Sequence, residues 1–331
     1  MKKVINKPEH VVEEMLEGMV YAYPQYVKKL DNFNVLVRKD SKIDKVTLVS
    51  GGGSGHEPSH GGFVGYGMLD GAVAGAVFTS PTPDQVYEAI KAVANDAGVL
   101  LVVKNYTGDV MNFDMAKEMA EMDGIKVDSV IVNDDVAVEN STWTIGRRGI
   151  AGTIFVHKLA GAKAETGATL EEVKAVAEKV IANVRSMGMA LTPCIVPEAG
   201  KPNFTLSENE IEIGMGIHGE PGTHREELKS ADEIVSYLMD KILDDINLEK
   251  DDEVAVLVNG LGGTPLMEQF IVNRKIHKIL ADKNINVYRT IIGEYMTSIE
   301  MAGFSISLLK LDDELKLLLD AKADTPAFTQ I

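Results

Sequence analysis

Short apolar runs alternate with helical patterns through the first part of the chain. Strands are predicted at residues 45–50, 73–78, 99–103 and 127–132, and helical patterns follow the second and third of these runs. This alternation is typical of βαβ units, because parallel strands need a crossover connection that is usually a helix. The first part of the chain is therefore expected to form an α/β domain with a mostly parallel sheet.

A second set of elements follows one long helical pattern at Thr169–Met187. The stretch 190–200 carries prolines and a glycine without clear periodicity, so it is the best candidate for a domain boundary. Beyond it, strands are predicted at residues 211–217, 253–259, 286–292 and 305–309.

The length of 331 residues exceeds the size at which a single core usually stops growing. We expect two α/β domains, residues 1–190 and 191–331. Each would have a mostly parallel or mixed sheet flanked by helices, with an active site between them.

The net charge and the cysteine content limit which binding partners and which cellular compartment are expected. The net charge of −17 disfavours nucleic acid and anionic membrane surfaces as partners, because both repel an acidic protein. No apolar run is long enough to predict a membrane-spanning helix. The single cysteine, Cys194, excludes an internal disulfide, which fits a cytoplasmic protein, and its apolar neighbours indicate packing rather than a nucleophile.

The strand predicted at 45–50 leads directly into the run GGGSGHEPSHGG, residues 51–62. Glycines let backbone N–H groups approach a ligand closely, so a binding loop is favoured over a structural turn. His56 and His60 formally match the HExxH zinc pattern, which requires one continuous helix. Pro58 would cost such a helix roughly 3 kcal/mol, so no metal is expected. The glycine–lysine–serine/threonine ending of a nucleotide-binding P-loop is also absent.

The run KNYTGD, residues 104–109, follows the strand predicted at 99–103. Lys104 could donate a hydrogen bond to a ligand, and Asp109 could accept a proton from one. Asp109 could equally be the N-cap of the helical pattern that starts at Met111. The residues alone leave these two interpretations open.

The run GMGIHGEPG, residues 214–222, surrounds His218 with glycines after a predicted strand. A neutral imidazole is a competent nucleophile near pH 7, and the glycines leave room for a ligand beside the ring. We favour a functional His218 over a structural one.

Other conspicuous residues are given simpler interpretations. Trp143 either shields the site or packs in the core. The remaining histidines, His10, His157, His224 and His277, are expected at the surface or in packing, and Met111, Met115, Met119 and Met122, at helical spacing, are expected in the core.

Taken together, the runs SGGGSGHEPSHGG, KNYTGD and GMGIHGEPG resemble those of the substrate-binding, K-type subunit of dihydroxyacetone kinases, and the resemblance covers essentially the whole chain. It implies that His218 holds dihydroxyacetone as a covalent hemiaminal. It also implies that Asp109 is the general base and His56 a second catalytic residue. The substrate contacts that the resemblance implies are Gly53, Ser54, Gly55, His56, Lys104 and Asp109.

The resemblance also implies the partners of this chain. Acting as a phosphotransferase of glycerol metabolism, the chain would bind no cofactor or metal. A separate L-type subunit would carry ADP or ATP with Mg, and an M-type subunit would rephosphorylate that nucleotide from phosphoenolpyruvate. Family members are commonly homodimers, so a cytoplasmic homodimer is expected. Whether phosphoenolpyruvate or ATP is the ultimate donor stays open.

Two other functions compete with the kinase subunit. Some members of this family bind dihydroxyacetone covalently but act as non-catalytic coactivators of a transcription regulator. Such a sensor needs His218 but not the groups that promote phosphoryl transfer, so the presence of His56 and Asp109 favours catalysis. The third hypothesis makes His218 a phosphohistidine carrier.

Overall fold

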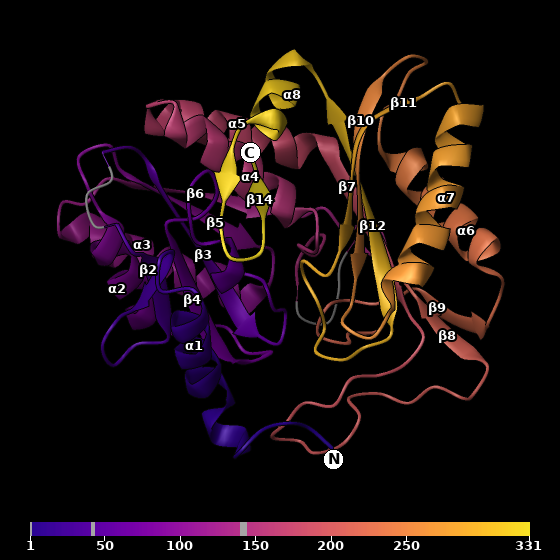
Figure 1. The fold of residues 1–331 in the computed structure, drawn as a ribbon, viewed down its shortest axis with the longest axis horizontal. Coiled ribbons are helices and arrows are strands. Elements are labelled where there is room, and N and C mark those ends of the chain that lie inside the picture. Colours follow the sequence, from indigo (N-terminus) through magenta and orange to yellow (C-terminus); the bar gives the residue numbers. More distant parts are fainter. Residues whose placement is uncertain (1, 41–43, 140–143) are drawn as a thin grey trace.

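Two six-stranded sheets organise the part of the chain that the computed structural model describes, residues 2–40, 44–139 and 144–331. Trp143 lies outside these residues. Figure 1 shows the two sheets with helices α4 and α5 between them. The α/β class, with two mixed sheets flanked by helices, is as the sequence predicted.

The first sheet has the strand order β1-β2-β4-β3-β5-β6. Strands β3, β4, β5 and β6 run parallel, β2 pairs antiparallel with β4, and β1 pairs antiparallel with β2. The bounds are β1 Val27–Lys29, β2 Val35–Arg38, β3 Thr47–Ser54, β4 Gly71–Val77, β5 Val99–Lys104 and β6 Val127–Val132. Helices α2 (Pro83–Val93) and α3 (Thr107–Met122) pack on one face of this sheet through an apolar core.

Helices α4 (Thr153–Glu165) and α5 (Leu170–Asn183) form a layer between the sheets. Leu100 of β5, Leu159 of α4 and Leu257 of the second sheet belong to one continuous core. Because α4 contacts protein on all sides, it is apolar around most of its circumference. No helix among the described residues is both long and apolar enough to cross a bilayer.

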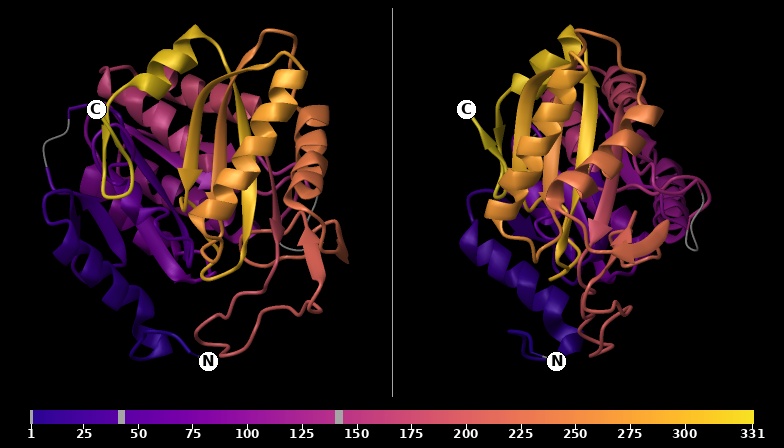
Figure 2. Two further views of the ribbon diagram at one scale, coloured as in Figure 1. Left: turned by 45° about the vertical axis from the view of Figure 1, so that its right-hand side comes forward. Right: turned by 90° about the vertical axis from the view of Figure 1, so that its right-hand side faces the viewer.

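The second sheet has the order β11-β10-β12-β7-β8-β9, in which only the pair β10 and β11 is parallel. Helices α6 (Ala231–Asp245) and α7 (Leu266–Asp282) cover its outer face, as Figure 2 shows. The strands are β7 Val184–Ala190, β8 Glu210–Ile213, β9 His224–Glu227, β10 Glu253–Gly260, β11 Asn286–Gly293 and β12 Gly303–Leu311.

Both ends of the chain pack against the first half of the molecule. Helix α1 (Val11–Ala22) lies beside the first sheet, and the C-terminal segment returns to it through α8 (Asp313–Asp320) and the hairpin β13–β14 (Ala323–Asp324 and Thr329–Gln330). The backbone N–H of Tyr66 donates to the Asp324 carbonyl at 3.0 Å. The final residues are therefore part of the fold.

Two predicted elements are wrong in their bounds. The helix predicted to reach Met187 ends at Asn183, and residues 184–190 form β7, which pairs with β12 of the second sheet. The strand predicted at 211–217 ends at Ile213, because Gly214 takes a φ of +74° and turns the chain. The division into residues 1–190 and 191–331 stays a prediction.

The placement of four methionines in the core is also wrong. Met111, Met115, Met119 and Met122 lie on the outer face of α3 with exposed fractions of 37 to 84%. The same helix packs on the sheet through Phe113, Ala116 and Ala120. Small residues allow the closer helix–sheet approach, so the face that carries them is buried.

Candidate active site

The carboxyl ends of β4, β3 and β5 lie side by side in the first sheet, and β3 lies between the two strands that follow it in the chain. The chain leaves β3 for β4 on one side and then crosses to β5 on the other. In open α/β sheets, ligands bind at such a switch point, outside the carboxyl ends of the strands. Gly51–Ser54 are the last residues of β3, so the turn expected at Gly51 begins only at Gly55.

His56 lies in the turn after β3 and is fully buried. Its Nδ1 lies 2.8 Å from the carbonyl oxygen of Thr297, and its Nε2 lies 3.0 Å from Nε2 of His218. Burial holds the pKa of His56 well below its usual value, and the nearby His218 and Lys104 lower it further. His56 is therefore a neutral ring at neutral pH.

Backbone hydrogen bonds join the turn after β3 to the connection between β11 and β12. The N–H of Ile299 donates to the Gly55 carbonyl at 2.7 Å, and the N–H of Thr297 donates to the His56 carbonyl at 3.2 Å. The Ser59 hydroxyl donates to the Tyr295 carbonyl at 2.6 Å. These bonds place His56 relative to the second sheet.

His218 lies in the glycine-rich loop that follows β8, and Glu220 of the same loop orients its ring. Nδ1 of His218 lies 3.0 Å from Oε1 of Glu220, and the backbone N–H of His218 donates to Oε2 at 2.9 Å. Burial acts to raise the pKa of the Glu220 carboxyl, but His218 and the buried Arg148 outweigh it and lower that pKa to about 2. Glu220 is thus a fixed carboxylate behind the imidazole.

The contact between the two histidines requires one proton. A carbonyl oxygen only accepts, so Nδ1 of His56 carries a hydrogen, and the Glu220 carboxylate likewise requires a hydrogen on Nδ1 of His218. The two Nε2 atoms therefore face each other with one hydrogen between them. His218 is a nucleophile when that hydrogen lies on His56, because Nε2 of His218 then carries a free lone pair.

Lys104 and Asp109 form a buried pair beside the histidines. Lys104 is the last residue of β5 and Asp109 lies in the first turn of α3, with 0 and 2% of their surfaces exposed. Nζ of Lys104 lies 3.7 Å from Oδ2 of Asp109, whereas Oδ1 has no hydrogen-bond partner among the described residues. Asp109 is not the N-cap, which is Tyr106 and makes no side-chain capping bond. Its free oxygen is available to a ligand hydroxyl.

An open pocket of about 610 Å³ lies in front of these groups. Phe78 stacks on His56 at 5.3 Å between ring centroids, and Tyr106 meets the edge of His218 at 4.6 Å. The pocket is lined by Gly53, Phe78, Thr79, Ser80, Tyr106, Thr107, Gly108, Asp109, Asn112 and His218.

The structure thus places the predicted site residues close together, but only some of them line the pocket. Gly53, Asp109 and His218 line the pocket, while His56 reaches it through its contact with His218. Ser54, Gly55 and Lys104 do not line it, and the Ser54 hydroxyl donates to the Gly75 carbonyl instead. Their role as substrate contacts stays a prediction.

Sequence reasoning missed two groups that orient the histidines. Glu220 stands two residues after His218 in the same glycine-rich run, so its position could have suggested a carboxylate–imidazole pair. Thr297 contacts His56 through a backbone carbonyl, for which the sequence carries no signal.

The formal HExxH match has no helical geometry. Residues 55–60 form turns rather than a helix, and the Nδ1 and Nε2 atoms of His56 are both engaged by protein groups. No group of three or more metal-ligating side chains occurs among the described residues.

Comparison with known proteins gives one consistent family. Residues 17–327 match the Dak1 domain. The PTS-dependent dihydroxyacetone kinase 1, dihydroxyacetone-binding subunit, of Listeria innocua is 54% identical over 98% of this chain and 100% of its own length. The corresponding PEP-dependent subunit of Escherichia coli is 43% identical over 99% of both chains.

Two solved structures share the fold at high similarity. The dihydroxyacetone kinase of C. freundii in complex with AMP-PNP and Mg2+ superimposes with a TM-score of 0.91 at 35% identity. It covers 99% of this chain, which spans 61% of that kinase. A dihydroxyacetone kinase operon co-activator has a TM-score of 0.91 at 34% identity, over 96% of this chain and 98% of its own.

Proposed function

This chain belongs to the Dak1 domain family, and on that premise we propose that it is the dihydroxyacetone-binding subunit of a dihydroxyacetone kinase. It holds the ketone as a hemiaminal on His218 while one terminal hydroxyl is phosphorylated to dihydroxyacetone phosphate. The observation that supports this best is the 3.0 Å contact between Nε2 of His218 and Nε2 of His56, with Glu220 behind His218. This arrangement orients a nucleophilic nitrogen and provides an acceptor for its proton.

The protons needed to form the hemiaminal are supplied and held by His218, His56 and Glu220. When the hydrogen between the two Nε2 atoms lies on His56, the lone pair on Nε2 of His218 attacks the carbonyl carbon of the ketone. As the carbon–oxygen π bond breaks, the oxygen takes the proton from His56. The alkylated ring keeps its hydrogen on Nδ1, so it is an imidazolium, and its positive charge stays paired with the Glu220 carboxylate.

The covalent bond also explains how a small ketone is distinguished from glycerol. Small polyols offer few contacts, because even the best tiny ligands gain only about 1.5 kcal/mol per heavy atom. A bond to His218 requires a carbonyl, which glycerol lacks. The adduct then holds a terminal hydroxyl in the pocket, where Oδ1 of Asp109 accepts its proton during phosphoryl transfer.

The phosphoryl donor is proposed to lie on another polypeptide. This chain has no P-loop motif, and relatives that it matches over nearly their whole length are named as the dihydroxyacetone-binding subunits of PTS- and PEP-dependent kinases. We therefore propose an L-type subunit that carries ADP or ATP with Mg, and an M-type subunit that recharges it from phosphoenolpyruvate. A cytoplasmic homodimer acting in glycerol metabolism completes the proposal.

The test is to mix this chain with an L-type subunit and its phosphoryl-donor system and to measure dihydroxyacetone phosphate. We expect turnover with dihydroxyacetone and none with glycerol. The similarity to an operon co-activator makes a sensor the second candidate. Ketone binding without turnover would favour the sensor, and phosphate on His218 would favour a phosphohistidine carrier.

A further inference from the structure

The buried ammonium of Lys104 has three neighbours and three hydrogens. Its Nζ lies 3.3 Å from the Gly51 carbonyl oxygen, 3.7 Å from Oδ2 of Asp109 and 3.1 Å from Nε2 of His60. The carbonyl and the carboxylate always accept. His60 accepts only if its Nε2 carries a lone pair, so this contact depends on the tautomer of the His60 ring.

Two acceptors face Nδ1 of His60. The Ser50 hydroxyl oxygen lies 3.4 Å away, with its own hydrogen donated to the Val102 carbonyl, and a second histidine lies closer. Nδ1 of His60 lies 3.0 Å from Nε2 of His157 on α4, and both rings are buried. An ammonium beside Nε2 requires the hydrogen of His60 on Nδ1, which then donates to Nε2 of His157. The reverse arrangement would point a hydrogen of His60 at the Lys104 ammonium, leaving two donors face to face.

Neither histidine competes with Lys104 for a proton. Burial, with Lys104 close by, lowers the pKa of His157 to about 3 and holds the pKa of His60 well below its usual value. Burial also lowers the pKa of Lys104, while the neighbouring Asp109 acts to raise it. Both rings are therefore neutral at working pH, and the hydrogen bonds run from Lys104 to His60 to His157.

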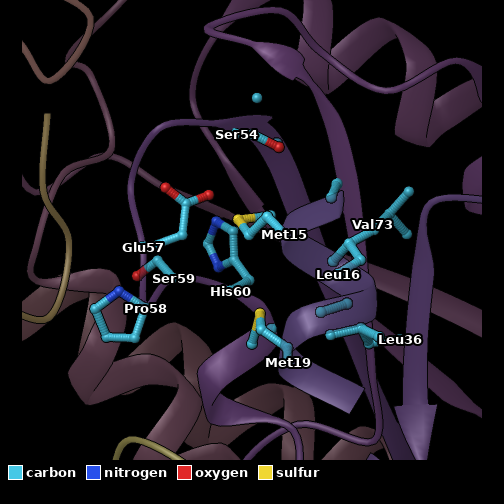
Figure 3. Close-up of a pocket in the computed structure, with 15 residues that line it drawn as sticks. Met15, Leu16, Met19, Leu36, Ser54, Glu57, Pro58, Ser59, His60 and Val73 are labelled. Carbon is cyan, nitrogen blue, oxygen red and sulfur yellow. The ribbon is translucent and has the colours of Figure 1, made fainter. Parts of the chain in front are cut away.

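The surroundings leave little freedom for this chain of contacts. Figure 3 shows His60 at a small pocket between α1 and the glycine-rich segment, with Met15 and Met19 in the same lining. Gly52 also lines this pocket, and a Cβ added there would lie 2.5 Å from Nζ of Lys104 and 3.4 Å from Oδ2 of Asp109. The glycine at this position makes room for the ammonium where His60 holds it.

We propose that His60 and His157 are positioning residues that hold the Lys104 ammonium against Oδ2 of Asp109. With Oδ2 held in this way, Oδ1 is the oxygen left for the substrate hydroxyl. His157 touches neither Asp109 nor the pocket, so it acts only through His60 and Lys104. This inference rests on the proposed function, since it assigns what orients the proposed base.

The tautomer is tested on the wild-type protein by nitrogen-15 NMR of labelled histidines, with the His60 signals assigned by the variant His60→Gln. We expect neutral His60 with its hydrogen on Nδ1 from about pH 6 to pH 8. A hydrogen on Nε2, or a charged ring, would overturn the inference. Because this measurement needs no turnover, it separates failure of the inference from failure of the proposed function.

The consequence for catalysis is tested with two substitutions of His157. His157→Phe keeps a ring but removes the nearer acceptor and leaves only the Ser50 hydroxyl oxygen, 3.4 Å from Nδ1 of His60. The side-chain oxygen of His157→Gln can still accept from Nδ1. We expect His157→Phe to lower kcat at least tenfold with little change in KM, and His157→Gln to stay within a few-fold of wild type. Equal damage in both variants, or none in His157→Phe, would contradict the proposal.

The pH profile distinguishes positioning from a general structural role. The groups facing Lys104 are Asp109 on α3, His60 and His56 after β3, and, through His60, His157 on α4. When His60 no longer accepts from Lys104, the charged form of Lys104 is less stable and its pKa falls. The alkaline limb of the kcat profile should therefore move about one pH unit lower in His157→Phe.

The matched control is Lys158→Met, on the same helix. Lys158 is equally buried and donates to the Leu318 carbonyl at 2.7 Å, away from the site. Its loss should leave the alkaline limb unchanged whatever it costs in stability. A shift of the same size in this control would show that the profile reports general loosening of α4, and would overturn the positioning role.

Discussion

At the scale of single residues, each proposed reactive group is oriented by a partner of opposite polarity. Glu220 holds Nδ1 of His218 and thereby presents Nε2, while Lys104 holds Oδ2 of Asp109 and thereby leaves Oδ1 free. His218 could be singled out by the glycine-rich run around it, whereas Asp109 stayed open between a base and an N-cap until the family resemblance was considered. The role of each oxygen and nitrogen could not be predicted, since it depends on contacts between distant segments.

Asp109→Asn separates the two proposed steps. The amide keeps the size of the side chain but cannot take the proton of the substrate hydroxyl, and general base catalysis typically contributes about 10²–10⁴-fold. We expect phosphoryl transfer to fall by that factor in the assay with the L-type subunit, whereas ketone binding on His218 persists. Loss of ketone binding in this variant would show that the division of roles is wrong.

Glu220→Gln tests the electrostatic pair with His218. The pKa of Glu220 is lowered from 4.5 to about 2, so its stabilisation is complete above about pH 4.5 and is lost as the pH falls through about 2. This contribution amounts to at most about 3 kcal/mol. Denaturant unfolding at a series of pH values should therefore show a weaker acid destabilisation in the variant than in wild type. Parallel pH dependence in both proteins would refute the pair's contribution.

At the scale of elements, turns placed after strands bring the site together. The four parallel strands of the first sheet were predicted from apolar runs, and β6 occupies the predicted residues 127–132, whereas the short strands β1 and β2 were missed. The error at Thr169–Met187 arose because residues 184–187 fit both periodicities, and only pairing with β12 decides for a strand. The prediction that the methionines of α3 lie in the core failed for a related reason. Helical spacing shows that residues share a face, but it does not show which face is buried.

Glycine positions give a test at this scale. A Cβ at Gly216 would clash with the Glu220 carboxylate and lie 2.7 Å from Nη1 of Arg148, so Gly216→Ala should displace Glu220 from His218. We expect at least a tenfold loss of ketone affinity by calorimetry. The control Gly18→Ala lies in the exposed face of α1 with open space around it, and should instead stabilise the protein by about 0.5–1 kcal/mol. Unchanged affinity in Gly216→Ala would contradict the role given to Glu220.

At the scale of the whole molecule, the site depends on how the two sheets are held together. His56 follows a strand of the first sheet, and His218 lies in a loop of the second, where the two rings meet. The segment 295–299, which belongs to the second half of the molecule, holds the first-sheet turn in place through hydrogen bonds to Gly55 and His56. The sequence predicted two α/β domains with a site between them. The segment 295–299 carries no motif, so its part in placing His56 became visible only in the structure.

Ligand binding should therefore stabilise the molecule as a unit. Dihydroxyacetone at about 100 times its Kd should add about 2.7 kcal/mol to the free energy of unfolding, and this gain is measurable as a rise in Tm. Replacing His218 by Asn should remove the ketone effect, while the small effect of glycerol stays nearly unchanged. If the variant loses the effects of both ligands equally, the bond to His218 is not what distinguishes them.

The central claim is that His218 bonds covalently to the ketone carbon, and carbon-13 NMR of dihydroxyacetone labelled at that carbon tests it most directly. With the wild-type protein, we predict that the bound signal leaves the carbonyl region and appears among saturated carbons that carry oxygen and nitrogen. With His218→Asn, no such signal should form. A bound ketone whose carbon stays in the carbonyl region of the wild-type spectrum would contradict the account.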